Sequence, residues 1–173
     1  LLLALCNILG LQAINIPTIY VDEKGVMRWS DTQKEASFFG VNYTLPFAHA
    51  YRAINYLGKN HKAAIDKDVY HFARLGFNAY RIHIWDVEIA GATGNLIEND
   101  HLDLFDYLVA KLRERNIRIL ITTMTNFGNG YPERNQNTGA FSYLYENCKI
   151  LDLQKAIEAQ TMYFSHFVQH VHP

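Results

Sequence analysis

The chain has 173 residues, of which 49% are hydrophobic and 19% charged, so it has enough apolar material for one ordinary globular core. Its 16 Lys and Arg residues almost balance 17 Asp and Glu residues, and no basic run could neutralise several phosphates. We therefore expect no nucleic-acid partner. The 11 Tyr, 10 Phe and 2 Trp residues suit core packing and also offer flat surfaces for ring-shaped ligands.

The first thirteen residues, LLLALCNILGLQA, resemble the apolar core and cleavage end of a secretory signal. They are too few to span a bilayer. We expect residues 1–13 to be a partial signal peptide, so the protein is secreted, periplasmic or on the cell surface, with no membrane span in the mature chain. A buried first strand is the alternative. Without this leader Cys148 is the remaining cysteine, so we expect no intrachain disulfide.

Residues 14–35 form a predicted extension before the main fold. Ile19 to Trp29 reads as two short strands joined by a turn at Glu23 to Gly25, which is the pattern of a small hairpin.

Three strand-and-helix units are predicted after this extension. The strands are residues 36–43, 78–85 and 117–124. A long loop follows the first strand, and its helix ends at Gly76, while the second helix ends at Asn116 and the third covers residues 152–171. The residues expected along one side of each helix are Ile65, Val69, Phe72 and Ala73; Leu102, Phe105, Leu108, Val109 and Leu112; and Ala156, Gln160, Tyr163, Phe164 and Phe167.

Equivalent strand positions, Phe39, Tyr80 and Ile119, recur about every 40 residues, which indicates a parallel α/β sheet. The third strand is apolar almost throughout, so we expect it to be buried on both faces. No strand is followed by a G-x-G-x-x-G loop, which favours a (β/α)8 TIM barrel over a doubly wound sheet. Because such a barrel needs about 250 residues, residues 36–173 are expected to be its first three units.

The second strand, NAYRIHIW, has an alternating pattern. Tyr80, Ile82 and Ile84 are expected to pack against helices, while Arg81, His83 and Trp85 face the barrel interior. Asp86 and Glu88 follow at the carboxyl end of the strand, where barrels carry their chemistry. The matching ends of the first and third strands carry Asn42 and Asn126. A buried arginine is costly unless a carboxylate pairs with it, so an anionic group should meet Arg81.

The segments FFGVNY, LGFNAYRIHIWDVEI and RILITTMTNFGNGYPE resemble the first three strands of retaining glycoside hydrolases of clan A, most nearly family five. The resemblance covers Ala36 to about Pro173. It implies that Arg81, in the N-x-x-R motif that begins at Asn78, supports a nucleophilic glutamate. It also implies that both catalytic glutamates lie on later strands, outside this chain. The substrate is then a β-linked glycan, with no cofactor and no metal, and the expected substrate-binding residues are Asn42, His83, Trp85, Asp86, Glu88, Asn126 and Phe127.

Retaining hydrolysis needs two carboxyl groups about 5 Å apart on opposed sides of the bond. Asp86 and Glu88 project from one short segment, so we expect them to be solvated loop carboxylates or acceptors for sugar hydroxyls. His83 either contacts substrate or bonds within the barrel, and Trp85 and Phe127 either stack on sugar rings or pack. The loop from Gly128 to Tyr143 either binds substrate or is a flexible surface loop without a binding role.

His166 and His170 lie one helical turn apart with His172 near, but no third ligand of a zinc motif is present, so exposed terminal histidines are expected. Three functions remain open at the level of sequence. They are an exported glycosidase, a carbohydrate-binding barrel without hydrolysis, and a metal-dependent barrel hydrolase. The three strand-and-helix units alone lack both catalytic glutamates, so we expect no glycosidase turnover from them.

Overall fold

A computed structural model describes residues 17–123, 139–145 and 149–171, and these fall into two compact units divided after Ser37. The described part of the first unit is a hairpin in which β1 (Ile19–Val21) pairs antiparallel with β2 (Met27–Trp29). The carboxylate of Asp22 accepts hydrogen bonds from the backbone N–H groups of Lys24 and Val26 and closes the turn. The predicted hairpin is confirmed.

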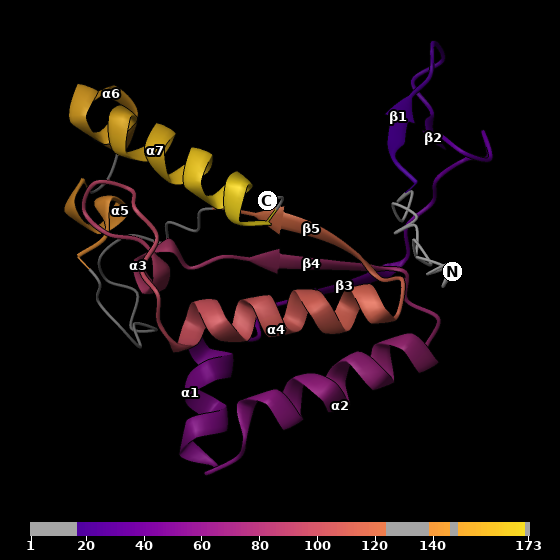
Figure 1. The fold of residues 1–173 in the computed structure, drawn as a ribbon, viewed down its shortest axis with the longest axis horizontal. Coiled ribbons are helices and arrows are strands. Elements are labelled where there is room, and N and C mark those ends of the chain that lie inside the picture. Colours follow the sequence, from indigo (N-terminus) through magenta and orange to yellow (C-terminus); the bar gives the residue numbers. More distant parts are fainter. Residues whose placement is uncertain (1–16, 124–138, 146–148, 172–173) are drawn as a thin grey trace, which may run out of the picture. The chain divides into compact units, whose positions relative to one another are not determined.

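The second unit contains a parallel sheet in the order β3 (Gly40–Tyr43), β4 (Ala79–His83), β5 (Arg118–Thr122), shown in Figure 1. The prediction of parallel strands is confirmed. The observed register places Val41, Tyr80 and Ile119 in one row, so the predicted equivalence of Tyr80 and Ile119 holds, while Phe39 lies two residues early. The first strand begins at Gly40, four residues later than predicted.

Gly40 is required by the close approach of β3 to β4. A Cβ at this position would lie 1.8 Å from the carbonyl oxygen of Ala79, which no side chain tolerates. A glycine therefore marks the point where the sheet begins.

Two predicted helices are found close to their expected bounds. These are α2 (His61–Arg74) and α4 (Asp100–Glu114). Asn60 and Asn99 cap them, because each side-chain oxygen accepts a backbone N–H three residues on. The chain then leaves both helices through left-handed residues, Gly76 at φ 76° and Asn116 at φ 56°, as predicted.

The last of the three predicted strand-and-helix units ends in α7 (Gln154–Val171). The short helices α5 (Phe141–Leu144) and α6 (Lys149–Asp152) precede it. The buried side of α7 carries Ala156, Ala159, Tyr163 and Phe167. Phe164 is 38% exposed and so lies beside the buried stripe rather than in it.

Sequence reasoning missed α1 (Ala48–Tyr56) and α3 (Asp86–Ile89), as well as the short helices α5 and α6. The predicted long loop after the first strand contains α1. Its N-cap is Phe47, which provides no capping side chain, and its aromatic and polar residues gave little helical periodicity. In α3 a single turn places Asp86 and Glu88 on the inside of the chain.

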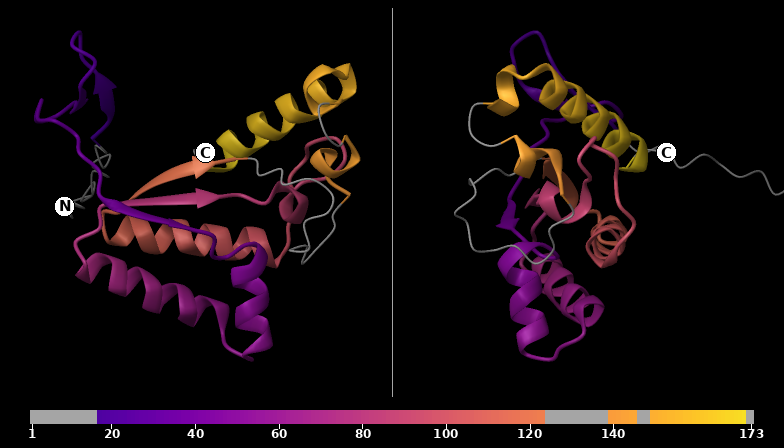
Figure 2. Two further views of the ribbon diagram at one scale, coloured as in Figure 1. Left: turned by 180° about the vertical axis from the view of Figure 1, so that it is seen from behind. Right: turned by 90° about the vertical axis from the view of Figure 1, so that its left-hand side faces the viewer.

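The two faces of the sheet differ. The ring of Phe72 on α2 lies 5.8 Å from that of Tyr80 and 5.9 Å from that of Tyr43, so α2 packs on the face carrying those residues. Figure 2 shows α2 and α4 running side by side along the sheet. On the other face Arg81 is exposed, and Leu120 is 46% exposed.

The expectation that the third strand is buried on both faces is therefore wrong, because nothing in the described residues covers this second face of β5. The described part of the chain is an α/β fold built on an open parallel sheet. No helix in this part is both long and apolar enough to cross a membrane.

Candidate functional site

Polar side chains gather on the open face of the sheet near the carboxyl ends of the strands. Asn42 and Arg81 are register partners, and His83 is the partner of Thr122. Partners in a parallel pair share a face, and residues two apart on a strand do so as well. Arg81 Nη2 donates a hydrogen bond of 3.1 Å to Thr122 Oγ1, which joins β4 to β5 across this face. We call the set of Asn42, Arg81, His83 and Thr122 the polar face.

Arg81 departs from the sequence expectation in its surroundings. The prediction that its cation is buried is wrong for this chain, because the side chain is exposed and bonds to a hydroxyl group. No ion pair to Arg81 occurs among the described residues. An exposed guanidinium presents several donors in a planar fork, which matches a carboxylate or a pair of hydroxyls. The anionic partner from a later strand stays a prediction.

His83 lies half-exposed beside Arg81 on the same face. Its partial burial, and then the positive charge of Arg81, lower the pKa of His83, so the ring is neutral at neutral pH. A neutral imidazole has one donor and one acceptor nitrogen, a combination that suits hydroxyl groups. The polar face therefore combines a cation, an amide and a neutral imidazole.

Trp85 does not join the polar face, although its position in the strand pattern placed it there. The strand ends at His83, and Trp85 takes the N-cap position of α3 with φ −94° and ψ 89°. Its side chain is 4% exposed and belongs to the hydrophobic core. In this structure Trp85 packs and offers no face to a sugar ring.

Asp86 and Glu88 are completely buried, so the prediction that they are solvated loop carboxylates is wrong. The single turn of α3 directs them into the interior instead of into a loop. Glu88 Oε2 accepts a hydrogen bond of 3.1 Å from the backbone N–H of Ala48, at the start of α1. Asp86 lies near Tyr163 of α7: burial first, and then the charge of Asp86, raise the pKa of that phenol.

Sequence reasoning also missed a buried histidine. His101, in the first turn of α4, is fully buried between Phe47, whose ring is 6.0 Å away and almost parallel, and Tyr51 at 4.1 Å. Its Nδ1 lies 3.2 Å from the carbonyl oxygen of Pro46 and 3.5 Å from Glu88 Oε2. One signal in the sequence pointed to it, since His101 precedes Phe105 by four residues and shares its helix face.

Two predicted residues, Asn126 and Phe127, lie outside the described residues, as does most of the loop from Gly128 to Tyr143. The polar face therefore contains two of the seven residues predicted to bind substrate, Asn42 and His83, together with the supporting Arg81.

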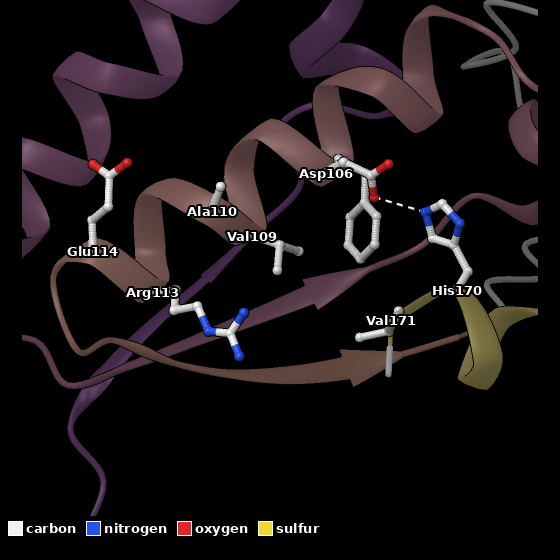
Figure 3. A pocket seen from close by; sticks show the side chains of 8 residues that line it. Asp106, Val109, Ala110, Arg113, Glu114, His170 and Val171 are labelled. Atoms are coloured by element: carbon white, nitrogen blue, oxygen red, sulfur yellow. Dashed lines mark hydrogen bonds and ion pairs between the residues drawn. The ribbon is translucent and has the colours of Figure 1, made fainter. Parts of the chain in front are cut away.

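A separate hollow of about 480 Å³ lies between α4 and the last turn of α7, shown in Figure 3. Phe105, Val109 and Val171 line it with apolar surface, and His170 Nε2 lies 2.7 Å from Asp106 Oδ1 at one end. His170 is thus engaged by a carboxylate on α4. No group of three metal-binding side chains occurs in the described ranges, and His172 lies outside them.

Comparison of the sequence with models of protein families and with curated proteins finds no match. A function for this chain therefore has to be inferred from its fold class and from the polar face.

Proposed function

We propose that this chain is the N-terminal part of an exported glycoside hydrolase that cleaves a β-linked glycan by the retaining, two-carboxylate mechanism. The observation that carries the proposal is the polar face, where Arg81, Asn42 and His83 stand together at the carboxyl end of a parallel sheet. This is the end at which parallel α/β folds bind ligands. The N-x-x-R motif that ends at Arg81 is the sequence feature that points to glycosidases.

The roles follow from the chemistry of each group. An exposed Arg81 is available to a carboxylate from a later strand and would keep it ionised and oriented as a nucleophile. Asn42 and neutral His83 would hydrogen-bond sugar hydroxyls. Asp86 and Glu88 are buried and do not supply the two catalytic carboxylates. The catalytic carboxylates are expected to come from later strands.

The barrel architecture is part of the same proposal. It is supported by two exposed apolar surfaces. Closure of a barrel would enclose the open face of the sheet at Leu120, and the helix of a following unit would cover a second apolar stripe along α7. This stripe has helical spacing and consists of Ile157, Phe164 and Val168 on α7 and Leu153 just before it, all exposed. Each earlier helix already packs against its neighbour, as Phe105 of α4 does against Phe167 of α7.

Sugar titration tests the proposal. We expect cello-, manno- or xylo-oligosaccharides to shift amide signals of β3 and β4 in the NMR spectrum of the chain, with saturable binding in the millimolar range. Arg81→Ala should weaken that binding about tenfold, the effect of one lost charge-assisted hydrogen bond. Arg113→Ala, on the outer side of α4, is the matched control and should leave it unchanged.

Two results would contradict the proposal. One is an absence of binding to every β-linked glycan tested. The other is the absence of an Asn-Glu pair at the end of the next strand in a longer form of the protein. A carbohydrate-binding barrel is the second candidate, favoured by the burial of both carboxylates near the site. It predicts binding without release of reducing ends from the longer form.

A further inference from the structure

A buried polar cluster ties together the segments that leave β3 and β4. The loop of residues 44–47 leads from β3 into α1, and it meets α3 and the first turn of α4 in the interior. Three buried side chains make polar contacts to this segment, and one of them is Tyr80, whose Oη donates a hydrogen bond of 3.2 Å to the backbone oxygen of Leu45. Glu88 bonds to the backbone N–H of Ala48, and His101 bonds to the backbone oxygen of Pro46.

The contact with Glu88 holds the loop in an unusual conformation. Ala48 has φ 49°, in the left-handed region that residues other than glycine seldom occupy. Glu88 Oε2 accepts the N–H of this residue at 3.1 Å, and the side chain is fully buried, so water does not compete for this hydrogen bond. On the other side, Asn99 donates to the backbone oxygen of Glu88 at 2.7 Å and caps α4, which fixes α3 to α4.

The contact with His101 is made by Nδ1, which carries a proton in both the neutral and the charged ring, so protonation changes only Nε2. The neutral ring donates its Nδ1 proton toward the Pro46 oxygen, since a carbonyl can only accept. Nε2 is buried, and no hydrogen-bond acceptor for it exists among the described residues. A second proton on this ring would therefore sit on a buried nitrogen with nowhere to donate, between the rings of Phe47 and Tyr51.

The charged and titratable groups around His101 come from four helices. Glu88 of α3 lies 3.5 Å away. The carbonyl of Pro46 and then the charge of Asp100 of α4 favour the protonated ring. His61 of α2, which stacks on Tyr51 of α1 at 4.4 Å, opposes it. Burial is the largest effect and lowers the pKa of His101 despite the Pro46 carbonyl and Asp100, and burial lowers the pKa of His61 as well.

We propose that Glu88 and His101 are positioning residues that clamp residues 44–48 at the carboxyl end of the sheet, and that protonation of His101 releases this segment. The segment continues directly from Asn42 and Tyr43 of β3, so the clamp sets the backbone on which one side of the polar face is built. Its effect on carbohydrate binding rests on the proposed glycosidase function. The clamp itself does not.

The sign of the pH effect follows from linkage. The pKa of His101 is lower in the folded protein than its ordinary value of about 6.5, so the clamped form loses stability as the pH falls below that value. Hydrogen exchange measures this on the whole chain. Protection of the Ala48 amide, corrected for intrinsic exchange, should fall about tenfold between pH 7 and pH 5. The amides of Ile65 and Val69 in α2 should retain theirs.

Variants separate the two side chains. His101→Gln removes the titrating ring, so the Ala48 amide should lose its extra pH dependence, whereas His71→Gln, on the exposed side of α2, should keep it. Glu88→Gln retains an acceptor of the same size without the charge, and should lower Ala48 protection at both pH values. A proton NMR titration of the His101 ring in the unchanged chain gives the midpoint without any substitution, so the test survives if a variant fails to fold.

The clamp is overturned if Ala48 protection is independent of pH, or if its loss and the titration of His101 have different midpoints. Neither measurement uses a sugar, so failure of glycan binding at every pH rejects the proposed function and leaves the clamp standing. Glycan binding that is equal at pH 7 and pH 5, with the segment released at pH 5, rejects the link between clamp and site.

Discussion

At the scale of single residues, burial decides which polar side chains are available to a ligand. Arg81 and Glu88 belong to neighbouring segments of one short sequence, yet one is exposed and the other is completely enclosed. The exposed cation can meet an incoming group, whereas the enclosed carboxylate is already used by the backbone of Ala48. Charge in the sequence is therefore a poor guide to function until the path of the backbone is known.

Gly40 provides a prediction at this scale. Gly40→Ala places a methyl group against the carbonyl of Ala79 and should force β3 away from β4, with a loss of about 3 kcal/mol or more in the free energy of unfolding. Gly76→Ala is the matched control. Gly76 has φ 76°, and a Cβ added there would have no atom within 4 Å. The substitution therefore introduces only backbone strain and should lower the free energy of unfolding by about 1 kcal/mol. Urea denaturation followed by circular dichroism measures both, and equal losses would show that the strands can separate freely.

At the scale of elements, the caps explain why the long helices begin where they do. Asn60 and Asn99 both accept an N–H in the first turn, but Asn99 also donates to the backbone oxygen of Glu88. The second bond connects α4 to α3, so this cap belongs to the tertiary structure as well as to its own helix.

The two caps should consequently differ in stability measurements. Asn60→Ala should cost about 1 kcal/mol, the ordinary value of an N-cap, and Asn99→Ala about 2 kcal/mol because a buried carbonyl loses its donor as well. Thermal unfolding of the two variants beside the unchanged chain gives the comparison. An Asn99→Ala loss no larger than that of Asn60→Ala would mean that the bond to Glu88 contributes nothing net.

Sequence patterns predicted the long helices and the parallel strands because those elements repeat over many residues. The stripe through Leu102, Phe105 and Leu108 spans two turns, and a single substitution would not hide it. The short helix α3 has no such repetition: four residues cannot show a period, so its two carboxylates were expected in solvent. The alternation of β4 likewise predicted the placement of Arg81 and His83, but it failed at Trp85, which lies two residues after the strand ends.

At the scale of the whole second unit, the uncovered surfaces are the main feature. Apolar side chains on one stripe of α7 and on β5 remain exposed in the described residues. Exposed apolar stripes and unpaired strand edges promote association between molecules.

We expect the chain to self-associate at micromolar concentration through this surface. Ile157→Glu places a charge in the middle of the stripe and should shift the chain toward monomer by about tenfold in dissociation constant, as burial of a charge against apolar surface is unfavourable. Met162→Glu is the matched control, because Met162 is 47% exposed but lies on another side of α7. Sedimentation velocity distinguishes the variants. A monomeric unchanged chain would show that this surface does not attract its own copy.

The order of strands in the sheet is the same as their order in the chain, β3, β4, β5. Each strand pairs with the one synthesised just before it, and each crossover helix is complete before the following strand emerges. Assembly can therefore proceed during translation by addition at a single growing edge, with no early strand waiting for a distant one. In this respect the open edge of β5 is the template on which any later strand of the same polypeptide would form.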